Sequence, residues 1–459
     1  MSRPRTSSRT IDPARRAAYD VLHEVGAGDA YANLVIRHVL ADRRLDGRDA
    51  AFATELVMGS LRQRGTLDAV LGACVDRPLD KLDPRVLDVL RLGSYQLLYL
   101  ATPAHAAVAS SVDLAGEVCG PGPRGLVNAV LRKVSRRDLS EWCDELTAGL
   151  DSTAALALRT SHPRWIVAAL RDALGPAADE LPELLAIDNE APTVTLVARP
   201  GRITVPELVS QTKDGQPGRW SPLAVRLAAG RPGDIPAIRD QRAGVQDEGS
   251  QLMALALTDA PLEGRDERWL DLCAGPGGKS ALLAAIGSGR GATLVAVEPR
   301  AARARLVRRA LSGAPGAHLV VRADGRQGPW QPGTFDRVLV DAPCSGIGVL
   351  RRRPEARWRR SPADVAELAR LQRDLLRAAL AAVRPGGLVA YVTCSPHIAE
   401  TDLVVDDVLR GRDDVEEVDA RAGLPPGVEV GPGPRVRLWP HRHGTDGMFC
   451  ALLRTRARR

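Results

Sequence analysis

The chain has 459 residues, of which 44% are hydrophobic and 26% are charged. This composition is typical of a soluble globular protein and excludes collagen, coiled coils and intrinsic disorder, while the length predicts about three domains. The net charge of +7 favours a polyanionic partner only modestly, because it is spread over a long chain. Nearly all of the basic residues are arginine, so the positions of the arginines are more informative than their number.

Cysteine content and hydropathy predict a reducing compartment and no membrane span. Seven cysteines without any Cys-x-x-Cys pair argue against a disulfide framework and against structural zinc, so we expect no metal. Residues 1–9 are basic and small with no apolar core after them, so we expect a disordered tail rather than a secretory signal. The longest uncharged stretch, residues 92–112, is too polar to span a membrane. We therefore expect a cytoplasmic protein, and a monomer.

Residues 10–137 have a helical pattern throughout. Apolar residues recur at spacings of three and four, as at Ala18, Val21, Leu22 and Val25. The pattern predicts a compact all-α bundle, which periodicity alone cannot distinguish from any other helical module.

Residues 138–245 have a mixed pattern. A helix is expected around residues 165–174, and an extended segment over residues 193–197. Turn signals such as Pro200-Gly201 and Asp214-Gly215 cluster between such segments. The pattern predicts a small α+β connecting module.

From residue 246 to 459, strands and helices alternate. This alternation predicts an α/β doubly wound parallel sheet, in which ligands bind beyond the carboxyl ends of the strands. A capping box at Ser361-Pro-Ala-Asp364 opens the longest helix, which is expected to end at Pro385-Gly-Gly387. The expected strands are residues 269–272, 293–297, 318–321, 337–340 and 388–393.

A glycine loop follows the first of these strands. Residues 271–280 read Asp-Leu-Cys-Ala-Gly-Pro-Gly-Gly-Lys-Ser, in which the glycines permit a tight turn and close approach of a ligand to the backbone. A phosphate-binding loop of an NTPase requires glycine at the position of Cys273, which argues against that class. A dinucleotide enzyme stays open, although the loop is not Gly-x-Gly-x-x-Gly.

Acidic residues at the next strand ends favour a nucleoside pocket instead. Glu298 ends the second strand and is placed to accept hydrogen bonds from both ribose hydroxyls, and Asp324, after the third, suits an adenine amino group. The alternative is that such acids merely cap neighbouring helices. Three consecutive strand ends carrying Asp271, Glu298 and Asp324 favour the pocket.

Two cysteines follow the next two strands, in Asp341-Ala-Pro-Cys344-Ser and Thr393-Cys394-Ser. If these strands are neighbours, both thiols meet at one rim of the sheet. A lone cysteine is usually an inert buried residue, but a pair at adjacent strand ends favours nucleophilic chemistry.

These motifs together resemble the Sun/Fmu family of S-adenosylmethionine-dependent RNA cytosine-5 methyltransferases. The resemblance covers roughly residues 245–453 and includes Gln246-Asp-Glu-Gly-Ser-Gln251 and Asp446-Gly-Met-Phe449. The helical first domain resembles NusB, most closely over residues 126–133, and the fusion is typical of the branch that acts on small-subunit ribosomal RNA.

The resemblance implies a role for each matching residue. Cys394 would be the nucleophile, Cys344 would serve product release, and Asp341 would contact the target cytosine and lie near the cofactor. Gly275 stands where many members have alanine, for which we expect no consequence, and Arg353 stands where histidine is frequent. The residues expected to bind S-adenosylmethionine are Cys273, Ala274, Gly275, Pro276, Gly277, Gly278, Lys279, Glu298, Asp324 and Asp341.

An arginine-rich stretch, residues 351–360, follows the Cys344 loop. Guanidinium groups suit phosphates and can stack on bases, so Arg351, Arg352 and Arg357 are predicted to bind RNA. The alternative is a solvated charged loop.

The sequence thus predicts methylation of cytosine carbon 5 in RNA, most naturally 16S ribosomal RNA, through a covalent cysteine–cytosine intermediate. The alternatives are a transfer RNA cytosine-5 methyltransferase and a non-catalytic NusB-like RNA-binding factor, and the intact cysteine pair speaks against the second.

Overall fold

The computed structural model describes residues 11–28 and 30–456, so the expected tail over residues 1–9 lies outside it. The chain forms two compact units. The helical unit comprises residues up to 171, 176–190 and 350–359, and the sheet unit comprises residues 172–175, 191–349 and 360–456. The segment 138–245, expected to be one connecting module, is therefore divided between the two units.

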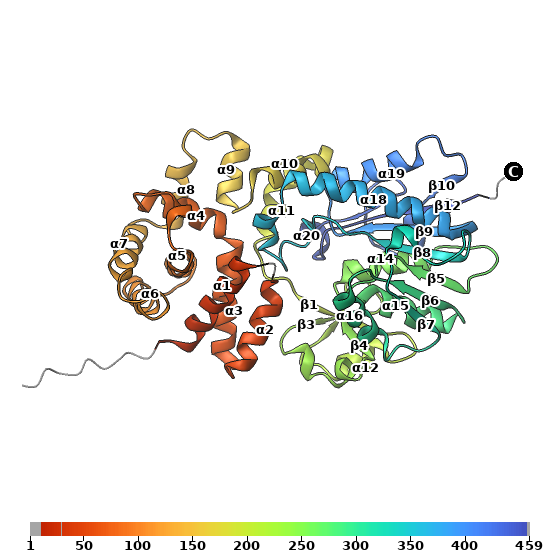
Figure 1. The fold of residues 1–459 in the computed structure, drawn as a ribbon, viewed down its shortest axis with the longest axis horizontal. Coiled ribbons are helices and arrows are strands. Elements are labelled where there is room, and N and C mark those ends of the chain that lie inside the picture. Colours follow the sequence, from red (N-terminus) through yellow and green to blue (C-terminus); the bar gives the residue numbers. More distant parts are fainter. Residues whose placement is uncertain (1–10, 29, 457–459) are drawn as a thin grey trace, which may run out of the picture. The chain divides into compact units, whose positions relative to one another are not determined.

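The helices of the helical unit are drawn in Figure 1, and most of them contribute residues to one apolar core. Ala18, Val21, Leu22 and Val25, the positions used to predict the bundle, are all buried in it. Its elements are α1 (Pro13–Ala27), α2 (Ala32–Asp42), α3 (Gly47–Arg62), α4 (Arg64–Cys74), η1 (Leu79–Lys81), α5 (Pro84–Leu98), α6 (Ala104–Val118), α7 (Arg124–Val134), α8 (Leu139–Thr147), α9 (Ser152–Arg159), α11 (Leu181–Ile187) and α17 (Ala356–Arg359). The chain passes between the units within α10 (Arg164–Leu174) and η2 (Gly175–Glu180).

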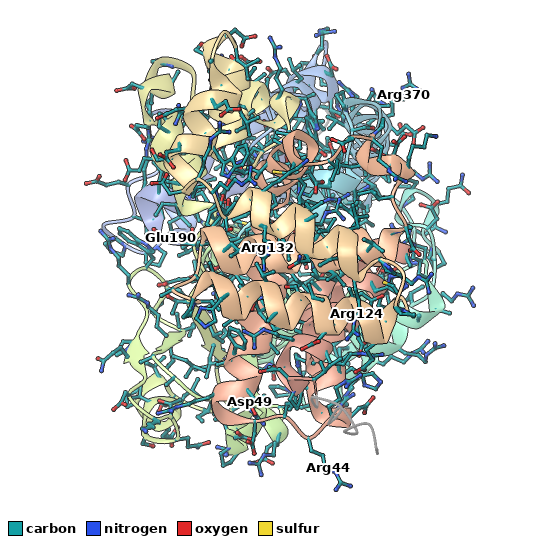
Figure 2. All side chains as sticks on the ribbon, turned by 90° about the vertical axis from the view of Figure 1, so that its left-hand side faces the viewer. Arg44, Asp49, Arg124, Arg132, Glu190 and Arg370 are labelled. Carbon is teal, nitrogen blue, oxygen red and sulfur yellow. The ribbon has the colours of Figure 1, made fainter. Side chains whose placement is uncertain are left out.

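Local signals fix where these helices begin. The side chain of Asp12 accepts a hydrogen bond from the backbone nitrogen of Arg15 at 2.9 Å, and proline occupies the first helical position of α1. The charged residues of α7 are exposed, and Figure 2 shows Arg124 and Arg132 projecting outward.

A small antiparallel sheet opens the sheet unit, with the strand order β2-β3-β1-β4. The expected extended segment 193–197 is found one residue later, as β1. The strands of this small sheet and the helices between them are β1 (Val194–Ala198), α12 (Val205–Ser210), β2 (Gln216–Pro217), β3 (Ala224–Leu227), η3 (Pro232–Asp234), α13 (Pro236–Arg239) and β4 (Ala243–Val245).

The main sheet has the order β10-β12-β9-β8-β5-β6-β7, with β11 pairing β12. Strands β5 to β9 are parallel, and β12 runs antiparallel to β9. Its strands are β5 (Arg268–Asp271), β6 (Thr293–Val297), β7 (His318–Val321), β8 (Phe335–Asp341), β9 (Val383–Thr393), β10 (Val415–Val418), β11 (Val436–Leu438) and β12 (Met448–Thr455). Its helices are α14 (Glu248–Thr258), α15 (Gly278–Gly289), α16 (Ala301–Leu311), η4 (Gly325–Gln327), α18 (Pro362–Ala382), η5 (Ile398–Glu400), α19 (Asp402–Leu409), η6 (Ala420–Gly423) and α20 (Pro440–His443).

Helices cover both faces of this sheet, which confirms the doubly wound prediction. Helices α18 and α19 lie on one face, and α14, α15 and α16 lie on the other (Figure 1). Alternate residues of one strand enter the two cores, so Leu339 packs on one side while Val338 and Val340 pack on the other. The capping box of Ser361 and Asp364 opens α18 as predicted.

From β5 the chain adds β6 and then β7 on one side of the sheet, and it returns to add β8 and then β9 on the other side of β5. The strand order therefore reverses between β5 and β8. In such sheets the crevice at this point, outside the carboxyl ends of the strands, binds the ligand. Asp271 ends β5 and Asp341 ends β8, so both carboxylates lie at this point.

Among the described residues, no helix is long and apolar enough to cross a membrane.

Candidate active site

The two cysteine loops meet at the carboxyl ends of neighbouring strands. β8 pairs with β9 in parallel, and the backbone nitrogen of Ala342 donates to the carbonyl oxygen of Val392 at 2.8 Å. The Sγ atoms of Cys344 and Cys394 are 3.4 Å apart. The expectation that the two thiols share one rim of the sheet is confirmed.

A buried carboxylate beneath the thiols ties the two loops together. Oε2 of Glu400 accepts hydrogen bonds from the hydroxyls of Ser345, at 2.5 Å, and Ser395, at 2.7 Å. Oε1 accepts from the Ser345 backbone nitrogen at 2.7 Å and from Nε2 of Gln372 at 3.1 Å. Glu400 is fully buried, and each serine directly follows one of the cysteines.

Sequence reasoning missed Glu400, although it noticed the serine after each cysteine. Those two serines were the signal, because paired hydroxyls at adjacent strand ends need an acceptor once they are buried. The acceptor lies six residues after Cys394, in η5, where no local pattern marks it.

A glycine contact holds the Cys344 loop against the closing strand. The backbone nitrogen of Gly348 donates to the carbonyl oxygen of Cys394 at 3.0 Å, and that of Gly447 donates to Gly348 at 2.7 Å. A Cβ atom at residue 348 would lie 2.3 Å from the carbonyl oxygen of Gly447. The motif Asp446-Gly-Met-Phe449 therefore positions the cysteine loops as well as opening β12.

A lysine supplies positive charge to the site. Nζ of Lys279 lies 2.9 Å from Oδ2 of Asp341. Burial would lower the pKa of this ammonium, but the charges of Asp341 and of Cys394 act in the opposite direction, and the pKa is raised overall. A cation near Cys394 favours the thiolate form of a cysteine.

The Cys344 thiol holds its proton strongly. Its hydrogen bond to Cys394 raises the pKa of Cys344 well above the ordinary value, and burial and the charge of Glu400 add to the effect. Cys344 therefore stays protonated at neutral pH.

The glycine loop forms an open cradle beside β6. The backbone nitrogen of Ala274 donates to Val297 at 2.8 Å, and Gly277 has a φ of +111°, which favours glycine. A Cβ atom at Gly278 would meet no atom within 4 Å, so the N-terminus of α15 begins in open space. This is the arrangement that lets a ligand approach backbone amides.

Gly275 matters more than we expected from the sequence. A Cβ atom at this position would lie 2.1 Å from Oε2 of Glu298 and 2.8 Å from Nε of Arg303. An alanine here would require the Glu298 side chain to move, so the glycine has a consequence for the geometry of this acid.

The three strand-end acids differ in their surroundings. Glu298 is 4% exposed, and its Oε1 accepts from the backbone nitrogen of Arg300 at 2.9 Å. The side chain of Asp324 is 46% exposed, caps η4 and pairs with Arg326 at 2.7 Å. Asp324 thus caps a helix, Glu298 accepts from the backbone just before α16, and the contacts of both acids with a nucleoside stay predictions.

Asp271 is the most deeply buried of the three. The hydroxyl of Ser280 donates to its Oδ2 at 2.6 Å, and its Oδ1 has no hydrogen-bond partner within the described part of the chain. Burial raises the pKa of Asp271 to about 7. A buried acceptor left open beside the glycine loop fits a ligand that donates hydrogen bonds.

No group of three or more potential metal ligands occurs among residues 11–28 and 30–456.

Residues 351–359 of the arginine-rich stretch belong to the helical unit, and burial contradicts part of the predicted role of the stretch. Arg357 is 0% exposed, and its guanidinium donates to the carbonyl oxygens of Arg62, Ser161 and Asp188 and to Oδ1 of Asn189. The prediction that Arg357 contacts RNA is therefore corrected, because its donors are occupied inside the unit.

The other two predicted arginines differ from each other. Arg351 is only 6% exposed, so burial argues against RNA contact there as well, whereas Arg352 is half-buried and stays a prediction. Arg353, at the position where histidine is frequent, stacks on Tyr31 at 4.7 Å from the ring centroid.

Comparison with known proteins identifies relatives of both units. Residues 257–454 match the family model described as 16S rRNA methyltransferase RsmB/F, and residues 12–136 match the NusB family. A protein of Mycobacterium tuberculosis H37Rv, provisionally named a methyltransferase, is 55% identical over 97% of both chains. Ribosomal RNA small subunit methyltransferase B of Vibrio cholerae is 32% identical over 96% of both chains.

Solved structures share the fold. The crystal structure of PH0851 superposes with a TM-score of 0.82 at 21% identity, covering 99% of this chain and all of that one. NSun6 from Pyrococcus horikoshii, solved with SFG, gives a TM-score of 0.55 at 17% identity and covers 64% of this chain and 99% of its own. At these identities the likeness shows the fold alone.

Proposed function

Because the chain belongs to the RsmB/F family of RNA methyltransferases, with a NusB domain at its start, we propose that it methylates carbon 5 of a cytosine in 16S ribosomal RNA. The observation that carries the proposal is the pair of thiols, 3.4 Å apart, beside a lysine–aspartate pair. Carbon 5 of cytosine is a poor nucleophile, so a second nucleophile must activate it.

Cys394 is that nucleophile in the proposed mechanism. Its thiolate forms a bond to carbon 6 of the cytosine, and the electron pair of the carbon 5–carbon 6 double bond moves to carbon 5. Carbon 5 then takes up the methyl group. The carbon 5 proton then passes to water, the electron pair of the carbon 5–hydrogen bond re-forms the double bond, and the sulfur–carbon 6 bond breaks with its electron pair returning to Cys394.

Lys279, Asp341 and Cys344 support these steps. The Lys279 ammonium favours the thiolate of Cys394 before attack. The Asp341 carboxylate accepts a hydrogen bond from the protonated N3 of the ring and so stabilises the developing negative charge. Cys344, whose raised pKa keeps it protonated, lies against the Cys394 sulfur where elimination must occur.

The proposed methyl donor is S-adenosylmethionine, which supplies an electrophilic methyl group when it is bound. The glycine loop would hold it against the amides of α15, Glu298 would accept hydrogen bonds from the ribose, and Asp271 would complete the cradle. Glu298→Ala should weaken binding by about 1–3 kcal/mol, roughly tenfold to a hundredfold, in calorimetry. Micromolar binding of ATP without binding of S-adenosylmethionine would overturn this assignment.

The reaction is tested with 16S ribosomal RNA from a deletion strain. Bisulfite sequencing should show one cytosine that is methylated in the parent strain, unmethylated in the deletion strain and methylated again after incubation with the purified protein and S-adenosylmethionine. Transfer RNA from the same strain serves as the second substrate. Methylation of transfer RNA alone would replace the ribosomal assignment, and methylation of neither would reject the proposal.

A further inference from the structure

One short segment of the sheet unit is strongly basic. Residues 299–323 contain six arginines and no acidic residue, so these 25 residues carry a charge of +6. Residues 351–360 hold a second concentration of six arginines, with one glutamate among them. Unlike that second stretch, residues 299–323 hold no acid that could pair with an arginine.

Helix α16 presents most of these arginines on its exposed side. Its inward positions, Ala304, Val307 and Leu311, are buried against the sheet. We define the basic face as the exposed residues Arg300, Arg305, Arg308 and Arg309. Within the described residues, none of the four is in an ion pair, and neighbouring Arg303 approaches Glu298 at 3.5 Å.

Several other arginines of the same unit are paired with acids. Arg373 lies 2.6 Å from Asp407, and Arg435 contacts Asp402 at 2.9 Å and Glu417 at 2.7 Å. The basic face differs from these sites, because none of its four arginines is paired with an acid within the described residues.

Helix stability does not account for the basic face. Arg305 is three and four residues from Arg308 and Arg309, and like charges at these spacings destabilise a helix. The helix dipole favours Arg308 and Arg309 in the last turn but disfavours Arg300 at the first. A cluster that repels itself is stabilised by a bound polyanion.

The basic face lies beside the cofactor cradle. Arg303, on the same helix, donates to the carbonyl oxygen of Gly275, and a Cβ atom at Gly277 would lie 2.7 Å from Cβ of Ala310. A polyanion held on α16 would thus pass close to the glycine loop. Arginines three or four residues apart on a helix have Cβ atoms about 5–6 Å apart. Each guanidinium can bind a phosphate through two parallel N–H donors.

We propose that the basic face of α16 binds the phosphate backbone of the RNA substrate. The inference rests on the proposed function, and it adds a docking surface that is separate from the thiols. It assigns the contact to backbone phosphates, so the basic face contributes affinity and salt dependence and does not choose the target base.

The test compares two triple variants that remove the same charge. Arg305→Gln, Arg308→Gln and Arg309→Gln together neutralise the basic face. Arg370→Gln, Arg377→Gln and Arg410→Gln neutralise three exposed arginines on α18 and after α19, and Figure 2 shows Arg370 projecting outward. RNA affinity is measured by fluorescence anisotropy at several salt concentrations, with S-adenosylmethionine affinity as the control for folding.

The basic-face variant should lose about two units of the slope of log K against log salt, since each phosphate contact contributes about 0.7–0.9. Its RNA affinity near 0.1 M salt should fall at least tenfold, while cofactor affinity stays within twofold. The control variant should keep most of the wild-type slope. Equal losses in both variants, or no loss in the first, would overturn the proposal.

Failure of the proposed function is distinguishable from failure of this inference. If the wild-type protein binds RNA with a steep salt dependence but methylates none, the chemistry is wrong. If it methylates RNA and the basic-face variant does so with the same KM, the docking surface is wrong.

Discussion

The sulfur atoms of Cys344 and Cys394 lie 3.4 Å apart, although 50 residues separate the two cysteines in the chain. Parallel pairing of β8 with β9 brings them together, and the serine after each one donates to Glu400. Because the two thiols hydrogen-bond, deprotonating one makes deprotonation of the other harder. The geometry therefore disfavours two thiolates side by side.

Single substitutions should separate the roles of the two cysteines. Cys394→Ala removes the attacking sulfur, so methylation should be lost with no covalent complex, while cofactor and RNA binding are kept. Cys344→Ala should still permit attack and methyl transfer but stall before elimination. RNA should then stay attached through Cys394 as a band that survives denaturing electrophoresis.

A reversed pattern would contradict these assignments. A trapped complex with Cys394→Ala and none with Cys344→Ala would mean that the roles are exchanged. Full activity in both variants would mean that the thiols are structural.

Glu400→Gln should impair catalysis through the position of the thiol loops. The amide keeps the size of the side chain but loses the charge that strengthens hydrogen bonds from Ser345 and Ser395. Because small misplacement of a reacting group can cost up to a hundredfold in rate, we expect kcat to fall roughly tenfold to a hundredfold. The affinity for S-adenosylmethionine should not change.

The control for Glu400→Gln is Glu367→Gln, which removes the same charge at an exposed site on α18. A second variant, Ser345→Ala with Ser395→Ala, removes the two hydroxyl donors and should resemble Glu400→Gln. If Glu400→Gln unfolds the protein, the serine variant still tests the role. Wild-type kcat in that variant would show that the carboxylate does not position the thiols.

Asp271 should make stability depend on pH. Its folded pKa of about 7 exceeds the ordinary value of 3.8, so below about pH 4 both the folded and unfolded states are protonated. Between about pH 4 and 7 the unfolded chain ionises while the folded protein keeps the proton, and the free energy of unfolding falls. Asp271→Asn has no carboxyl group to ionise and lacks this loss. As the pH rises from about 4 to 7, the free energy of unfolding of the variant should therefore increase relative to that of wild type by up to about 4 kcal/mol.

Urea unfolding of the cofactor-free protein between pH 4.5 and 8 measures this difference. Ser280 donates to Asp271, so Ser280→Ala serves as the comparison that alters the hydrogen bond without removing the acid. Parallel stability curves for wild type and Asp271→Asn would show that Asp271 ionises normally in the folded protein.

The sequence predicted most of what local patterns encode. The strands over residues 293–297 and 318–321 have the expected bounds, and Cys344 meets Cys394, as expected if their strands are neighbours. By contrast, α18 ends at Ala382, and β9 runs through Pro385-Gly-Gly387, which the sequence marked as a stop. Glycine and proline are turn signals in isolation, but strand pairing determines whether the chain turns there.

Contacts distant in sequence explain the rest of what was missed. Glu400 gained its role from Ser345, 55 residues earlier, as well as from nearby Ser395, and Arg357 gained its role from carbonyl groups of residues 62, 161 and 188. A run of arginines suggests a solvated or RNA-bound surface when only neighbours are considered. Nothing in residues 351–360 shows which of them will be buried.

The last prediction concerns Arg357. Its guanidinium satisfies three backbone carbonyls and Asn189, and burial lowers its pKa to about 10. Arg357→Met keeps the length of the side chain but leaves these buried acceptors without donors, which should cost about 2–4 kcal/mol. The unfolding midpoint of the helical unit should fall by several degrees, as followed by circular dichroism. RNA affinity and its salt slope, measured below that midpoint, should match wild type, because a fully buried cation releases no counterions on binding.

Arg352→Gln is the matched variant at a half-buried arginine, and it should leave the free energy of unfolding within about 0.5 kcal/mol of wild type. A normal midpoint with a reduced salt slope for Arg357→Met would instead return this residue to the RNA interface.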